Sequence, residues 1–140
     1  MQEKLDKTLN SIRQQSSLIP KVAIVLGSGL GFLADEIEVE VSLAYSEIEG
    51  FPQTSVPGHS GKLVLGHLAG LPLVMMAGRV HYYEGFTPEE VVFPIRVLKE
   101  LGAETLILTN AAGGIHPDFK VGDLMLLDDH INFLGFNPLY

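Results

Sequence analysis

The sequence contains no cysteine and few basic residues. The lack of cysteine excludes disulfide bonds and thiolate metal sites and leaves the redox compartment open. Lys and Arg number 9 against 17 Asp and Glu, so the formal net charge is −8. Because nucleic acids and anionic lipids are bound through clustered Lys and Arg, we expect neither as a partner, although a local phosphate pocket is compatible with this balance.

Long apolar runs are absent as well. No stretch approaches the roughly 18 apolar residues of a membrane helix, and the N-terminal MQEKLDKTLNSIRQQ has no apolar region of the signal-peptide kind. What the chain does have is 140 residues, of which 46% are apolar and 19% are charged. This composition predicts a single globular domain over residues 1–140, soluble and cytoplasmic.

Hydrophobic patterning predicts an α/β fold. Helical spacing of apolar residues indicates a helix at 3–15, and a glycine turn leads into a short helix within 28–37. Thr87 and Glu90 match a capping box, so a further helix is expected to start after Thr87. Short apolar runs predict strands, of which the first and fifth are expected to be buried, at 21–27, 39–45, 62–70, 71–78, 105–110 and 123–133. Strands that alternate with helices favour a mixed or mostly parallel central sheet.

Glycine-rich or polar segments lie next to four of these strands. Ligands of open α/β sheets bind beyond the carboxyl ends of the strands, so this coincidence is the main functional signal. The four segments are GSGLG (27–31), GHSG (58–61), GRVHYYEG (78–85) and NAAGG (110–114).

The first segment, GSGLG, has the chemistry of an anion nest. Its glycines allow a tight bend with exposed N–H groups, and Ser28 adds a hydroxyl. The alternative is a strand-to-helix turn with no ligand. A dinucleotide-binding fingerprint would need a glycine where Phe32 stands, and the Gly-Lys-Ser/Thr ending of a P-loop is missing.

The segment GRVHYYEG carries one of only three arginines in the chain. The planar fork of Arg79 suits an oxyanion. If the backbone is extended there, Arg79, His81 and Tyr83 point the same way and line one wall. The alternative is an exposed loop in which Arg79 pairs with Glu84.

The remaining polar segments each have two interpretations. His59 of GHSG lies either in a mobile loop that closes on a ligand or in a solvated loop, and alone the segment favours the latter. NAAGG, which starts at Asn110, either lets a ligand approach its backbone or forms a tight turn. DDHIN (128–132) could supply metal ligands or an acid–base pair, but its spacing matches no metal signature and favours a structural network.

Five segments together resemble a known family. VLGSGLG, PGHSGKLVLG, AGRVHYYEGF, LILTNAAGGI and VGDLMLLDDHIN occur in the order and spacing of the trimeric class of purine nucleoside phosphorylases. The resemblance covers the chain from residue 20 onward. It implies a three-layer fold with a mixed, mostly parallel sheet. Family members extend well beyond residue 140, so the chain resembles an N-terminal portion whose sheet is incomplete at the C-terminus.

The resemblance also implies an activity. Members of the family cleave inosine, guanosine and their 2'-deoxy forms with inorganic phosphate, giving the free base and (deoxy)ribose 1-phosphate. No metal or organic cofactor is implied, phosphate is the co-substrate, and the assembly is a homotrimer. Arg79 and His81 correspond to the catalytic pair and Tyr83 to the ribose contact. The residues that correspond to the phosphate site are Ser28, His59, Arg79, His81 and Ala111.

Other functions stay open at this point. Methylthioadenosine phosphorylase belongs to the same family, and the base-contacting residues that separate the two lie beyond this chain. A truncated, non-catalytic module that binds phosphate or assembles with another chain is a second alternative. A dinucleotide-binding domain would rest on GSGLG alone.

Overall fold

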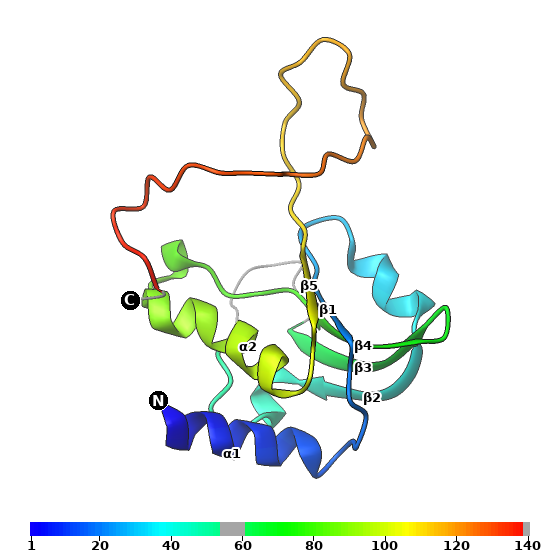
Figure 1. Ribbon diagram of the computed structural model, residues 1–140, viewed down its shortest axis with the longest axis vertical. Coiled ribbons are helices and arrows are strands. Elements are labelled where there is room, and N and C mark those ends of the chain that lie inside the picture. The colour runs from blue at the N-terminus through cyan, green and yellow to red at the C-terminus, as the bar shows by residue number, and fades with distance from the viewer. Residues whose placement is uncertain (54–60, 139–140) are drawn as a thin grey trace.

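One mixed five-stranded sheet forms the centre of the computed structural model, which describes residues 1–53 and 61–138 (Figure 1). The strands lie in the order β2-β3-β4-β1-β5. Their bounds are β1 Val22–Val25, β2 Glu38–Ala44, β3 Lys62–Leu68, β4 Leu71–Ala77 and β5 Thr105–Leu108. β1 pairs in parallel with β4 and β5, whereas β3 pairs antiparallel with β2 and β4. The predicted α/β fold with a mixed sheet is therefore confirmed, with parallel and antiparallel pairings in equal number.

Three helical elements form where the sequence predicts them, at 3–15, within 28–37 and after Thr87, whereas the two short 3-10 helices at 45–47 and 82–84 were not predicted. The helices are α1 (Gln2–Arg13), α2 (Pro88–Glu100) and the short 3-10 helices η1 (Gly31–Glu36), η2 (Tyr45–Glu47) and η3 (Tyr82–Glu84). At the start of α2 the Thr87 hydroxyl accepts the Glu90 N–H at 3.3 Å, and the Glu90 carboxylate accepts the Thr87 N–H at 2.8 Å. This is the predicted capping box, and the backbone hydrogen bond from Thr87 lowers the pKa of Glu90.

Apolar side chains pack on both faces of the sheet, which gives three layers. On one face, buried residues of β1, β3 and β4 pack against α1 and α2, which lie next to each other (Figure 1). On the other face, η1 covers a smaller cluster. The first cluster includes Leu5, Ile12, Val25, Leu63, Leu65, Val74, Met76, Phe93, Val97 and Leu98, and the second Leu26, Ile37, Val64, Leu73 and Met75.

The two C-terminal strand predictions need correction. A strand forms at β5, but all four of its residues are exposed, because β5 lies at the edge of the sheet. The strand predicted at 123–133 is wrong, since that segment runs without helix or strand. Leu124 and Leu126 are 97% and 95% exposed. An apolar run becomes a strand only beside a hydrogen-bonding neighbour, and the described part of the chain places none next to 123–133.

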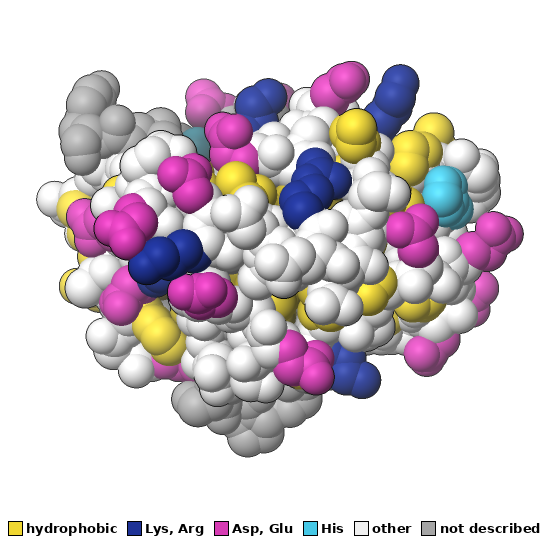
Figure 2. All heavy atoms as spheres, turned by 90° about the horizontal axis from the view of Figure 1, so that it is seen from below, with side chains coloured by type: hydrophobic (Ala, Val, Ile, Leu, Met, Phe, Trp, Pro, Cys, Tyr) yellow, Lys and Arg dark blue, Asp and Glu magenta, His cyan; other side chains and the backbone are white. Residues whose placement is uncertain are grey.

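The described surface has no single-sign charge patch on the face that carries α1. Acidic and basic side chains lie among one another there (Figure 2). No helix within the described ranges is long and apolar enough to cross a bilayer.

Candidate functional site

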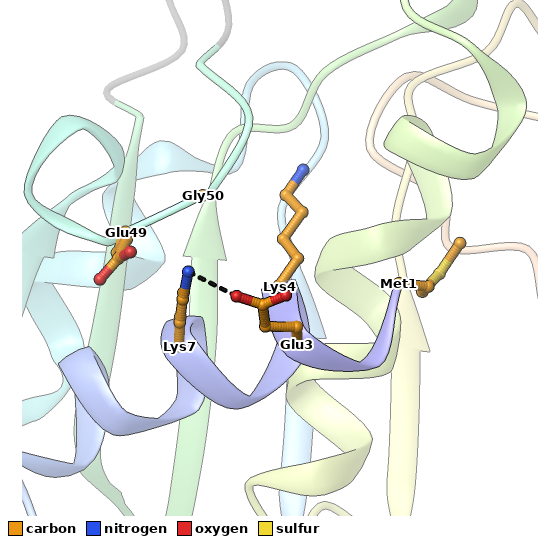
Figure 3. A pocket seen from close by; sticks show the side chains of 6 residues that line it. All are labelled: Met1, Glu3, Lys4, Lys7, Glu49 and Gly50. Carbon is orange, nitrogen blue, oxygen red and sulfur yellow. Dashed lines mark ion pairs between the residues drawn. The ribbon is translucent and has the colours of Figure 1, made fainter.

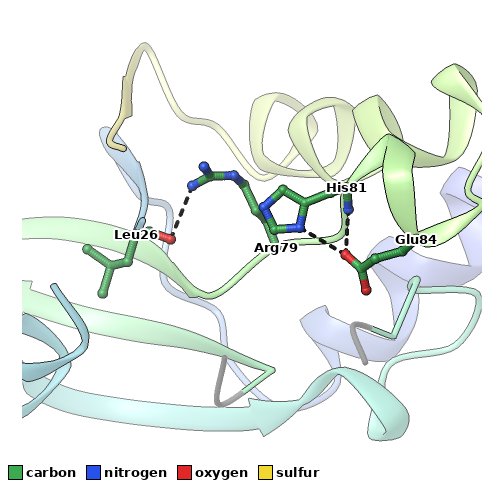
Figure 4. Close-up of polar contacts among 4 residues, drawn as sticks. All are labelled: Leu26, Arg79, His81 and Glu84. Carbon is green, nitrogen blue, oxygen red and sulfur yellow. Dashed lines mark hydrogen bonds and ion pairs between the residues drawn. The ribbon is translucent and has the colours of Figure 1, made fainter. Parts of the chain in front are cut away.

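The ends of three neighbouring strands meet at Arg79. This residue follows β4, and its Nη1 donates to the carbonyl oxygen of Thr109 at 3.0 Å and to that of Leu26 at 3.4 Å. Leu26 follows β1 and Thr109 follows β5, so the guanidinium extends over the carboxyl ends of adjacent parallel strands (Figure 4). The two carbonyl groups fix the direction of the one arginine that the sequence singles out as an oxyanion ligand.

The glycine segment after β1 is attached to the same strand end. The Gly27 N–H donates to the Thr109 hydroxyl at 2.8 Å, and this hydroxyl donates to the Val25 carbonyl oxygen at 3.0 Å. A Cβ atom on Gly27 would lie 2.6 Å from the Thr109 carbonyl oxygen. Glycine is thus required where the two backbones approach. Gly29, two residues after Gly27, has a φ of 85°, a backbone conformation that residues with a side chain rarely adopt.

His81 is held by a carboxylate. Its ring Nδ1 lies 2.9 Å from Glu84 Oε1, and the same oxygen accepts the His81 backbone N–H at 2.7 Å (Figure 4). Both contacts arise because η3 turns the chain back on itself directly after His81. The carboxylate orients the ring and fixes which nitrogen faces it.

The single extended wall predicted from Arg79 to Tyr83 does not form. His81 has extended backbone angles, but η3 starts at Tyr82, so the alternation of side chains ends there. Tyr83 still lies beside His81, because the two rings stack with centroids 4.8 Å apart. Tyr83 is 74% exposed, so it lies at the rim of the site.

The structure describes two of the three remaining predicted site residues. Ser28 is exposed and directly follows Gly27. Ala111 is exposed and lies two residues after Thr109, and its carbonyl oxygen accepts from Asn110 Nδ2 at 3.3 Å. His59 lies outside the described residues.

Sequence reasoning missed the residues that support this arrangement. The buried Tyr45 donates its hydroxyl to the Gly78 carbonyl oxygen at 2.6 Å, and burial raises the pKa of this phenol. Thr109 joins the segments around β1 and β4, and Glu84 holds His81. Of these three residues, only Glu84 could have been found from the sequence. It lies three positions after His81, and an acidic residue at that spacing can accept a hydrogen bond from the residue that starts a helical turn.

Two other features are separate from this site. A pocket of about 350 Å³ is lined by Met1, Glu3, Lys4, Lys7, Glu49 and Gly50, and Lys7 pairs there with Glu3 at 2.8 Å (Figure 3). None of the predicted site residues lines it.

Among residues 1–53 and 61–138, no three His, Asp or Glu side chains are grouped to hold a metal ion. In DDHIN the His130 N–H donates to its neighbour Asp129 at 2.8 Å, in an exposed segment.

Comparisons with solved structures identify the fold. A purine nucleoside phosphorylase of Schistosoma mansoni in complex with inosine is 44% identical with a TM-score of 0.77, over 86% of this chain and 42% of that one. A purine nucleoside phosphorylase in complex with ribose 1-phosphate is 45% identical with a TM-score of 0.79, over 86% of this chain and 44% of that one.

Sequence comparisons agree with the structural ones. Purine nucleoside phosphorylase 1 of Bacillus subtilis (strain 168) is 52% identical over 139 residues, which cover 99% of this chain and 51% of that protein. The Bos taurus purine nucleoside phosphorylase is 54% identical over 123 residues, covering 86% and 43%. The chain thus spans about half the length of the curated relatives it matches. The sequence profile of the phosphorylase superfamily matches residues 21–140, and the chain belongs to this superfamily.

Proposed function

We propose that the protein cleaves purine nucleosides with inorganic phosphate, releasing the base and (deoxy)ribose 1-phosphate. The observation that carries the proposal is the position of Arg79 across the carboxyl ends of β1 and β5, where the glycine segment also lies. Support comes from relatives named purine nucleoside phosphorylases, whose sequences are 52% and 54% identical to this chain. Inosine, guanosine and their 2'-deoxy forms are the proposed substrates.

The proposed phosphate site combines the Arg79 guanidinium with several further hydrogen-bond donors. Arg79 and His81 supply side-chain N–H groups, Ser28 a hydroxyl and Ala111 a backbone N–H, and His59 is proposed to join them from outside the described residues. Tyr83, stacked on His81 at the rim, is proposed to contact the ribose. Phosphate serves as the co-substrate, and we propose no metal or organic cofactor.

Positioning and electrostatics then account for the chemistry. The C1'–N9 bond of the nucleoside breaks with its electron pair leaving on the base, while a phosphate oxygen forms the new bond to C1'. The sugar passes through a cationic, oxocarbenium-like state, which a phosphate dianion held beneath C1' stabilises. Arg79 and His81 would hold that dianion in place, so we propose them as the catalytic pair.

The proposed localisation and assembly rest on the resemblance to the family. We propose a cytoplasmic homotrimer without nucleic-acid or membrane partners. The net charge of −8 supports the lack of nucleic-acid and anionic-lipid partners.

Two observations favour a second candidate function. The chain covers only about half of its relatives' length, and the apolar side chains of its C-terminal segment are exposed. The 140 residues by themselves would then form a phosphate-binding part without a catalytic cycle.

Hypoxanthine release from inosine separates the two functions. The chain is incubated with inosine with and without phosphate, and Arg79→Ala serves as the control. Phosphate-dependent release that the variant loses supports the phosphorylase. Phosphate binding that depends on Arg79 without any release supports the non-catalytic part, and neither binding nor release would refute both.

A further inference from the structure

We infer that Thr109 is a positioning residue that couples the glycine segment to Arg79, a role that rests on the proposed function of this site. Its hydroxyl accepts the Gly27 N–H at 2.8 Å, and its carbonyl oxygen accepts from Arg79 Nη1 at 3.0 Å. One residue therefore contacts the two segments that are proposed to hold phosphate from different sides.

Threonine has the chemistry that this place needs. A hydroxyl both donates and accepts, and here it donates to the Val25 carbonyl oxygen while it accepts from Gly27. The Thr109 backbone N–H also donates to the Val25 carbonyl oxygen, at 3.1 Å, so the parallel pairing of β5 with β1 continues one residue past the strand. The side chain and backbone together fix Thr109 against the end of β1.

Gly27 lies tightly against the backbone of residues 109–110. It is buried, and a Cβ atom there would lie 2.8 Å from the Asn110 Cα as well as 2.6 Å from the Thr109 carbonyl oxygen. Without the hydroxyl of Thr109, the Gly27 N–H would lose its acceptor in a buried place, which is costly. The backbone of 109–110 would then shift, and the carbonyl group that directs Arg79 would shift with it.

Thr109→Val tests this coupling, because valine keeps the shape and removes the hydroxyl. Thr109→Ser keeps the hydroxyl and should therefore keep both the phosphate affinity and the slow hydrogen exchange of the parent chain. Thr105→Val is the matched control, since Thr105 is an exposed threonine at the start of β5, the strand that Thr109 follows. Inorganic phosphate is titrated into each protein by calorimetry, and hydrogen exchange of the Gly27 amide and of the Arg79 Nη1–H is followed by NMR.

Thr109→Val is expected to change both the glycine segment and the segment that carries Arg79. Thr109→Val should weaken phosphate binding about tenfold and speed exchange at Gly27 and at Arg79, whereas Thr109→Ser and Thr105→Val should stay within about twofold of the parent chain. Unchanged Arg79 exchange in Thr109→Val, or a serine variant as impaired as the valine variant, would overturn the coupling. Phosphate binding that is absent from the parent chain or insensitive to Arg79→Ala would instead refute the proposed function, and the exchange data would still decide the coupling.

Discussion

The hydroxyl of Tyr45 donates a hydrogen bond of 2.6 Å to the carbonyl oxygen of Gly78, the residue directly before Arg79. Gly78 has a φ of 102°, so the chain bends at this point to start the Arg79 segment. The Tyr45 ring is buried and packs against Phe51 with centroids 4.8 Å apart. Tyr45 thus fixes the peptide from which Arg79 extends.

Removal of the Tyr45 hydroxyl should lower the unfolding free energy. It should also make the unfolding free energy less dependent on pH in the alkaline range. Tyr45→Phe keeps the ring but leaves the Gly78 carbonyl without this donor, which should cost about 1 kcal/mol near neutral pH. Burial raises the folded-state pKa of Tyr45, so its contribution to stability is complete below the unfolded value of about 10 and is lost as the pH rises above it. Urea unfolding at neutral and alkaline pH measures both effects. An alkaline decline equally steep in parent and variant would contradict the assignment to Tyr45.

Gly27→Ala should destabilise the fold through backbone contact. The added Cβ atom would meet the Thr109 carbonyl oxygen at 2.6 Å and the Asn110 Cα at 2.8 Å, and neither atom can rotate away. We expect a loss of about 1–3 kcal/mol in unfolding free energy. Gly31→Ala is the matched control, because nothing lies within 4 Å of its added Cβ atom, and it should change stability by less than about 0.5 kcal/mol. Equal urea midpoints for the two variants would rule out the close approach at Gly27.

Local chemistry made part of this structure predictable. The capping box of Thr87 and Glu90 joins residues three apart, so the sequence alone contains it. Polar side chains that directly follow an apolar strand indicate Arg79 and His81 as site residues. The role of Ala111 and the ribose contact of Tyr83 rest on the family resemblance, whereas the glycine segment also indicates Ser28. All the predicted site roles stay predictions.

The supporting contacts were not predictable because they join distant residues. Tyr45 and Gly78 lie 33 positions apart, and Gly27 and Thr109 lie 82 apart. No spacing rule connects such pairs before the sheet order is known. The strand predicted at 123–133 failed for the same reason, because strand formation depends on a neighbouring strand as well as on an apolar run.

The contact between Glu84 and His81 predicts a further effect on phosphate binding. Glu84→Ala removes the carboxylate that lies 2.9 Å from His81 Nδ1 and accepts its backbone N–H at 2.7 Å. The ring would lose its fixed orientation, and the affinity for inorganic phosphate should fall about tenfold. Glu89→Ala changes an exposed glutamate in the first turn of α2 and should leave the affinity unchanged. A loss of similar size in both variants would contradict the orienting role of Glu84, and net charge would not explain it, because removing a carboxylate favours anion binding.

The exposed apolar side chains of residues 123–134 should bind an apolar dye. Their replacement should leave the folding stability unchanged. Leu124 and Leu126 are 97% and 95% exposed, so the chain should bind the apolar fluorophore ANS at neutral pH. Replacing both by Ser should lower ANS fluorescence while the urea midpoint stays constant, because these side chains have no burial to lose. Leu63 is fully buried in the main core, and Leu63→Ala should cost about 2–5 kcal/mol. A double Ser variant as destabilised as Leu63→Ala would mean that the segment packs against the domain in solution.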